Sequence, residues 1–167
     1  KEQEMELTDT LLIPAPRAVV FAALNDPEIL QRCIPGCEAL VKHSDTELEA
    51  KVVLKIGPVK ARFTGHVTLD PSEAPQAFSL SGQGSGGAAG FAKGGASVQL
   101  EDRGEETLLS YTAKAEIGGK LAQLGSRLVT GTARKLAAQF FATFSDEVAE
   151  RQSVQTLGQA PESAERQ

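Results

Sequence analysis

Residues that could carry out chemistry are few in this sequence, which has two His and two Cys among 167 residues. Nucleophilic catalysis needs a Ser or Cys beside a base that a third group orients, and His43 and His66 offer few ways to build such a site. Cys33 and Cys37 are separated by three residues and could give two ligands to zinc, but no further ligands are evident. We therefore expect no catalytic residue, no metal, and two buried or partly buried thiols.

A glycine-rich segment covers residues 82–95 and begins with Gly82-Gln83-Gly84-Ser85-Gly86-Gly87. This run has the G-x-G-x-x-G spacing of loops that bind a pyrophosphate at a helix start. Strand-like runs flank it on both sides, however, whereas a dinucleotide fingerprint lies between a parallel strand and a helix. The sequence favours a hairpin end, where Gly lets twisted strands diverge or a ligand pass close.

A basic stripe is predicted on the last helix. Cations recur every seven residues from Lys120, and no acid occurs between Gly118 and Phe144. A solvated helix face is one explanation, and contact with anionic lipid headgroups or an acidic partner is the alternative, which nearby Phe side chains favour. The candidate residues for membrane or partner contact are Lys120, Arg127, Arg134, Lys135, Phe141 and Phe144.

Two hydrophobic periods define the elements that position these groups. Residues 7–13 alternate as a first strand, and two short helices follow over residues 16–24 and 28–33. The period is two between residues 38 and 117, which predicts a meander of antiparallel strands. Gly118-Gly119 ends that pattern, and a helical run continues to about Glu150. We expect a single domain over residues 1–150 and a polar, flexible tail over residues 151–167.

A ligand cavity is predicted between the sheet and this helix. The inward registers include small residues such as Ala50, Gly65 and Ala113, so a curved sheet under a long helix encloses more volume than its side chains fill. A tightly packed dry core is the alternative. The predicted cavity wall consists of Phe63, Val67, Phe78, Val98, Tyr111, Leu121, Gly125, Leu128, Thr132 and Leu136.

Composition narrows the function further. The formal net charge of -5 argues against a domain that wraps nucleic acid. The acidic start lacks an apolar stretch, and nowhere do 18 apolar residues follow one another, so we expect neither a signal peptide nor a membrane-spanning helix. The expected location is cytoplasmic, with peripheral contact at the inner face of the cytoplasmic membrane as an option.

The order of elements is that of a helix-grip fold, an α+β architecture in which a curved antiparallel sheet wraps around a long C-terminal helix. Over about residues 5–148 the sequence resembles the CoxG family of carbon monoxide dehydrogenase subunits, which is part of the START-like or SRPBCC superfamily. The resemblance rests on Pro16 through Leu24, Asp26-Pro27-Glu28, Cys33-Ile34-Pro35-Gly36-Cys37, Ile56-Gly57-Pro58-Val59 and Gly119-Lys120-Leu121-Ala122-Gln123-Leu124-Gly125.

This resemblance implies a small cytoplasmic accessory protein, not an enzyme, associated with a molybdenum-type carbon monoxide dehydrogenase or a related hydroxylase. It implies a bound hydrophobic molecule such as a quinone or lipid, no required cofactor, and a part in recruiting the enzyme to the membrane. One hypothesis is a carrier of that molecule, and the alternative is a membrane-recruitment adaptor with an incidental cavity. A cyclase or hydrolase would need an acid or base on an inward register, and the strand pattern provides none.

Overall fold

Seven antiparallel strands form one sheet in the order β1-β7-β6-β5-β4-β3-β2. The computed structural model describes residues 3–165, with the side chains of residues 3–151. Neighbours in the sheet are neighbours in the chain, except that β1 joins the meander through β7. The strands are β1 (Gln3–Ile13), β2 (Cys37–Ser44), β3 (Glu47–Ile56), β4 (Val59–Asp70), β5 (Ala77–Ser85), β6 (Phe91–Arg103) and β7 (Glu106–Gly118).

The helices lie at the start and the end of the chain. A short 3-10 helix, η1 (Gly87–Ala89), lies between β5 and β6. Asp26 caps α2 by accepting a hydrogen bond from the Glu28 amide, with Pro27 in the first turn. The remaining helices are α1 (Arg17–Leu24), α2 (Pro27–Cys33), α3 (Lys120–Gln123) and α4 (Ser126–Glu165).

The prediction of a single helix from residue 118 to about residue 150 is wrong in two respects. Gly125 has a φ of +95°, in the left-handed region that a helix cannot contain, so the chain turns between α3 and α4. At the other end α4 continues to Glu165. Side chains beyond residue 151 lie outside the described residues, and the domain boundary at residue 150 stays a prediction.

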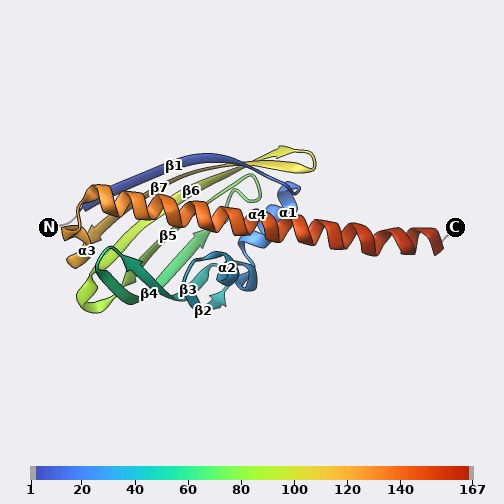
Figure 1. Ribbon diagram of the computed structural model, residues 1–167. Coiled ribbons are helices and arrows are strands. Elements are labelled where there is room, and N and C mark those ends of the chain that lie inside the picture. Colours follow the sequence, from blue (N-terminus) through green and yellow to red (C-terminus); the bar gives the residue numbers. More distant parts are fainter. Residues whose placement is uncertain (1–2, 166–167) are drawn as a thin grey trace.

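The sheet curves around α4, as Figure 1 shows, with β1 along one side of the helix and β3 and β4 along the other. Helices α1 and α2 pack against α4 at one end of the sheet, and α3 lies at the opposite end, beside β7. This arrangement is the predicted helix-grip fold.

The strand registers predicted from the alternation are confirmed. Ala50 faces Gly65 and Val52 faces Phe63 across β3 and β4, so both inward rows point to the same side. The expectation that no acid occupies an inward register is wrong at two positions, because Asp9 of β1 lies directly opposite Tyr111 of β7 and the exposed Asp102 of β6 lies directly opposite the buried Thr107. Asp9 is exposed, since β1 is an edge strand and the side chain reaches solvent there.

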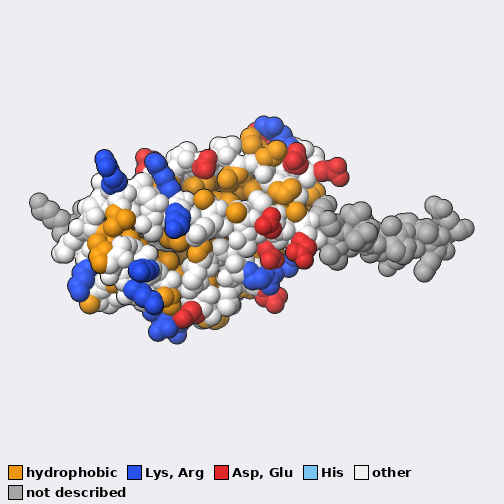
Figure 2. Space-filling view, viewed as in Figure 1, with side chains coloured by type: hydrophobic (Ala, Val, Ile, Leu, Met, Phe, Trp, Pro, Cys, Tyr) orange, Lys and Arg blue, Asp and Glu red, His pale blue; other side chains and the backbone are white. Residues whose placement is uncertain are grey.

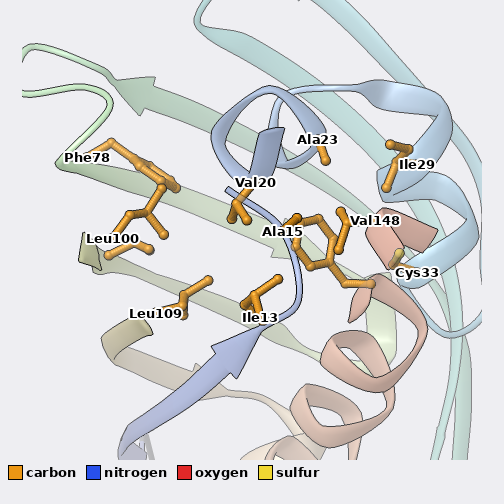
Figure 3. Packing of buried hydrophobic residues seen from close by; sticks show 12 residues of the cluster. Ile13, Ala15, Val20, Ala23, Ile29, Cys33, Phe78, Leu100, Leu109 and Val148 are labelled. Atoms are coloured by element: carbon orange, nitrogen blue, oxygen red, sulfur yellow. The ribbon is translucent and has the colours of Figure 1, made fainter. Parts of the chain in front are cut away.

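A dense core joins α1, α2 and the buried part of α4 to the sheet. In Figure 3, Val20 and Ala15 lie between Val148 of α4 and Phe78 of β5. Phe144 is fully buried in this cluster. The prediction that Phe144 contacts a membrane or partner is therefore wrong, because α1 and α2 cover the end of α4 that the sequence pattern left open.

Candidate ligand-binding cavity

An apolar cavity of about 450 Å³ lies between the sheet and the first half of α4. We call it the aliphatic chamber, because Phe63 and Phe140 are the only aromatic residues among the lining residues and Thr132 is the only one with a polar side chain. The lining residues are Met5, Ile34, Pro35, Ala50, Val52, Leu54, Ile56, Phe63, Gly65, Gly84, Ala92, Ile117, Leu121, Val129, Thr132, Ala133, Leu136, Ala137 and Phe140.

A second apolar cavity, of about 290 Å³, lies next to the first, toward α1 and α2. We call it the aromatic chamber, because four aromatic rings line it, together with two polar side chains, those of Asn25 and Tyr111. Ile34, Ala50 and Phe140 line both chambers, so the two are neighbours in one cavity system. The other lining residues are Leu24, Leu30, Leu40, Leu48, Val67, Leu69, Phe78, Leu80, Ala96, Val98, Leu109 and Phe141.

The predicted wall residues divide between the two chambers. Val67, Phe78, Val98 and Tyr111 line the aromatic chamber. The residues of the predicted wall in the aliphatic chamber are Phe63, Leu121, Thr132 and Leu136.

Gly125 and Leu128 lie outside both chambers, which corrects the predicted wall. The turn at Gly125 separates α3 from α4. The helical spacing of apolar residues that starts at Leu121 therefore does not continue into α4. Leu128 is 39% exposed and lies over the β3–β4 turn, where a Cβ on Gly57 would come within 2.9 Å of its Cδ2 atom. The residue that faces the aliphatic chamber at this height of α4 is Val129.

The aromatic rings of the second chamber contact one another. The ring of Tyr111 stacks on that of Phe141 with a centroid distance of 5.5 Å, and Phe140 meets Phe141 edge to face at 5.0 Å. Phe141 therefore faces inward, and its predicted contact with a membrane or partner is wrong because its ring lies against Tyr111 of the sheet.

The two polar groups of the aromatic chamber differ in how they are satisfied. The Asn25 amide donates to the backbone carbonyl of Phe21 at 2.9 Å, which uses its Nδ2 group. Burial, and to a lesser degree the Asp9 carboxylate, raise the pKa of the Tyr111 hydroxyl. Tyr111 is therefore a protonated phenol and a hydrogen-bond donor at neutral pH.

Two segments that form part of the aliphatic chamber's walls carry only cations among their charged side chains. Residues 50–69 and 117–145 form much of these walls and contain no Asp or Glu. In Figure 2, Lys and Arg gather over α3, the β3–β4 end and the first turns of α4, while most Asp and Glu lie toward the other end. The exposed cations are Lys51, Lys55, Lys60, Arg62, Lys120, Arg127, Arg134 and Lys135.

The other candidate sites from the sequence have structural explanations. Cys33 is buried, Cys37 is half-buried, and both are free thiols, as predicted. The described part of the chain contains no group of three or more His, Cys, Asp or Glu placed to hold a metal ion. The glycine-rich segment joins β5 to β6, and Gly86 comes so close to the Phe63 ring that a side chain would collide with it.

Several lining residues were missing from the predicted wall. Ala133 and Ala137 follow the observed phase of α4, which starts only after Gly125. Leu24, Asn25 and Leu30 come from α1 and α2, whose packing over the cavity end no local pattern indicates. The apolar stripes of these short helices show that each buries one face. They do not show which part of the protein that face packs against.

A seven-stranded sheet that grips a long helix, with an apolar cavity between them, defines a START-like helix-grip protein. Solved structures with this fold include a START superfamily protein from Mycobacterium smegmatis, with 15% identity, a TM-score of 0.64, and coverage of 87% of this chain and 97% of that chain. The Zhui aromatase/cyclase from Streptomyces sp. R1128 has 12% identity, a TM-score of 0.67, and coverage of 89% and 96% respectively. The fold is thus shared with at least one enzyme.

The chain belongs to the CoxG family of carbon monoxide dehydrogenase subunits, whose model matches residues 10–149. A conserved protein from Geobacillus kaustophilus is similar at 29% identity, with a TM-score of 0.80 and coverage of 87% of this chain and 95% of that chain. No curated protein matches the sequence. No helix in the described residues is long and apolar enough to cross a membrane.

Proposed function

We propose that this chain carries a hydrophobic molecule, a quinone or another lipid, between the sheet and α4, and catalyses no reaction on it. The observation that carries this proposal is the lining of the aliphatic chamber, where a single hydroxyl, that of Thr132, accompanies otherwise apolar walls. A volume of about 450 Å³ lies within the range of small-molecule sites, which are mostly apolar. The lining residues of both chambers include no Asp, Glu, His, Lys, Arg or Cys, the side chains that acid-base or covalent catalysis most often uses.

Two neighbouring alanines of α4 test this proposal. Ala137 lines the aliphatic chamber, whereas Ala138 is exposed. Native mass spectrometry of the purified protein, with solvent extraction of what denaturation releases, should find a lipophilic molecule on the wild type and on Ala138→Phe. Ala137→Phe fills the chamber and should lose the molecule while keeping the circular dichroism spectrum. Equal occupancy of all three proteins would contradict the proposal, as would a wild type that neither contains nor takes up a lipophilic quinone.

We also propose a molybdenum-type carbon monoxide dehydrogenase, or a related hydroxylase, as the enzyme that the carrier serves. The family to which the chain belongs supports this proposal, because it is described as a subunit of that dehydrogenase. Size-exclusion chromatography of the chain mixed with such an enzyme tests the association. Elution of the chain and the enzyme in separate peaks, at every protein concentration tested, would contradict the association.

A second candidate function is recruitment of the enzyme to the inner face of the cytoplasmic membrane. The observation in its favour is that residues 50–69 and 117–145 carry cations and no acid, in a chain whose net charge is -5. Changing Lys120, Arg127 and Arg134 to Glu should reduce sedimentation with phosphatidylglycerol vesicles at low salt. The control variant changes three cations of β6 and β7, Lys93, Arg103 and Lys114, to Glu. Both variants then have the same net charge and differ only in where the charges lie. Equal sedimentation of both variants would contradict an electrostatic contact through α3 and α4.

A further inference from the structure

The two ends of the cavity system are packed differently. The end toward α1 and α2 belongs to the main core, whose twelve buried residues include Phe144 and Val148 of α4. The α3 end has a separate cluster with three buried residues, Ile117, Leu121 and Val129. A protein opens locally where few apolar contacts are buried. The α3 end is therefore the part of the cavity wall that opens most readily.

Helix α3 covers the aliphatic chamber at this end of the sheet. Leu121 of α3 lines the chamber together with Ile56, the last residue of β3, and Val129 in the first turn of α4. Figure 1 shows α3 at the end of the sheet opposite α1 and α2. Leu121 and Ala122 are both buried, so α3 closes the chamber against solvent. A ligand that passes this end has to displace α3 first.

Two glycines flank this four-residue helix and allow it to move as a unit. Gly119 has a φ of +75° and Gly125 a φ of +95°, both in the left-handed region that favours glycine. Open space surrounds the position where a Cβ on Gly125 would lie, so rotation of the chain there meets no obstacle. A side chain on Gly119 would collide with the backbone of Gly90, and its absence lets the chain pivot at this contact. Both positions are therefore suited to the change in backbone angles that a hinge absorbs.

One hydrogen bond ties α3 to the edge of the sheet. The side-chain amide of Gln3 in β1 donates to the Ala122 carbonyl at 2.6 Å, although the two residues are 119 positions apart in the chain. Gln3 lies outside both chambers, so its amide acts on α3 and not on a ligand. At the opposite end, Arg32 of α2 donates two hydrogen bonds to Glu147 of α4, at 3.1 and 2.9 Å. The contacts at the two ends can thus be removed separately.

We propose that α3 is a hinged lid, and that the aliphatic chamber fills and empties through the opening left when α3 swings away from β1. Gly119 and Gly125 are the hinges, and the hydrogen bond from Gln3 to Ala122 is the latch. This inference rests on the proposed carrier function and adds the route by which the carried molecule enters and leaves.

The first test needs no ligand. Hydrogen exchange followed by NMR compares the Ala122 amide, which donates to the Gly119 carbonyl, with the Leu30 amide of α2, which donates to the Asp26 carbonyl. In the wild type we expect the Ala122 amide to be protected at least about tenfold less than the Leu30 amide. Gln3→Ala should speed exchange at Ala122 about 3- to 10-fold, the usual range for one hydrogen bond, and leave Leu30 unchanged. Equal protection of the two amides, or no effect of Gln3→Ala, would overturn the lid.

The second test follows Nile red, a neutral lipophilic dye, into and out of the protein by stopped-flow fluorescence. Gln3→Ala should raise the association and dissociation rate constants together, about 3- to 10-fold, because a latch changes access and not affinity. The dissociation constant should then stay within about twofold of the wild-type value. Arg32→Ala is the control at the opposite end and should leave both rate constants unchanged.

Faster exchange of the dye with Arg32→Ala alone would place the entrance at α1 and α2 and overturn the lid. A change in the dissociation constant with Gln3→Ala, without faster association, would make Gln3 part of the binding site and also overturn it. A wild type that takes up no Nile red would contradict the carrier function on which the inference rests, whereas hydrogen exchange at Ala122 would still decide whether α3 opens.

Discussion

Tyr111 of β7 and Phe141 of α4 stack with their ring planes 21° apart, and this contact joins the helix to the strand next to the sheet edge, beside the aromatic chamber. Stacked aromatic pairs contribute about 0.5 to 1.5 kcal/mol beyond their burial. We expect Phe141→Leu to lower the free energy of unfolding by at least that amount in urea denaturation, whereas Phe141→Tyr should retain most of it. Equal stability of the Leu variant and the wild type would contradict a stabilising stack.

Phe144 should be among the most sensitive positions of α4. Its side chain is fully buried in the cluster with α1 and α2, and Phe→Ala changes in protein cores cost about 3 to 5 kcal/mol. Leu128→Ala provides the comparison, because Leu128 is 39% exposed and should lose far less. Urea denaturation of both variants measures the difference. A Phe144→Ala variant as stable as Leu128→Ala would show that Phe144 is not a core residue.

Two glycines near the start of α4 should respond to Ala in opposite directions. Gly125→Ala places a side chain at a φ of +95° and should cost about 1 to 2 kcal/mol, although the surrounding space is open. Gly131 lies inside α4 with nothing near its missing Cβ, so Gly131→Ala should stabilise by about 0.5 to 1 kcal/mol. Thermal unfolding measures both. The same sign of change at the two positions would contradict the turn between α3 and α4.

Thr107 connects the start of β7 to the chain that enters α1. Its buried hydroxyl donates to the Ala15 carbonyl at 2.8 Å. Thr107→Val keeps the shape but leaves that carbonyl without this donor, and we expect a loss of about 1 to 3 kcal/mol. Thr107→Ser retains the hydroxyl and should restore part of the loss. If Val and Ser variants are equally stable by urea denaturation, the hydrogen bond contributes little.

The Cys33 thiol should make stability depend on pH in the alkaline range. Burial raises the pKa of Cys33 from its ordinary value to about 11, and Glu147 adds to the shift. Because the folded state holds this proton more tightly than the unfolded state, the stabilisation is complete below the unfolded pKa of about 9 and is lost as pH rises toward 11.

The free energies of unfolding of the wild type and Cys33→Ala, measured from pH 7 to pH 11, test this expectation. Their difference should be constant up to about pH 9 and should then change in favour of the variant. In the native wild type at pH 8, Cys33 should also react with a thiol reagent only as fast as the protein unfolds. Parallel curves over the whole pH range would contradict the raised pKa.

Much of the sheet could be predicted from the sequence, because the alternation of apolar and polar residues lies within each strand and depends on no distant contact. The alternation in residues 48–56 and 59–69 fixes which side chains face inward, and the observed pairs such as Val52 with Phe63 follow from it. Local turn signals, such as Gly57-Pro58, also place the strand ends correctly.

What the sequence could not predict depends on contacts between distant segments. The phase of α4 depends on the turn at Gly125, which a count of apolar spacings passes over. Phe141 and Phe144 resemble an exposed aromatic end, because the sequence does not show that the first stacks on Tyr111 of β7 or that α1 and α2 cover the second. The division into two chambers depends on Phe140, whose place at their boundary only the assembled fold determines.

The stacked phenol of the aromatic chamber is also the protein's only natural chromophore of its kind, since the chain has one Tyr and no Trp. Its near-ultraviolet absorption and emission therefore come almost entirely from a single side chain that lines the cavity. A bound conjugated ring would absorb far more strongly than this weak background, so a purified sample would reveal an occupied cavity in its absorption spectrum alone. Quenching of the same emission would follow the filling of the cavity without any added label.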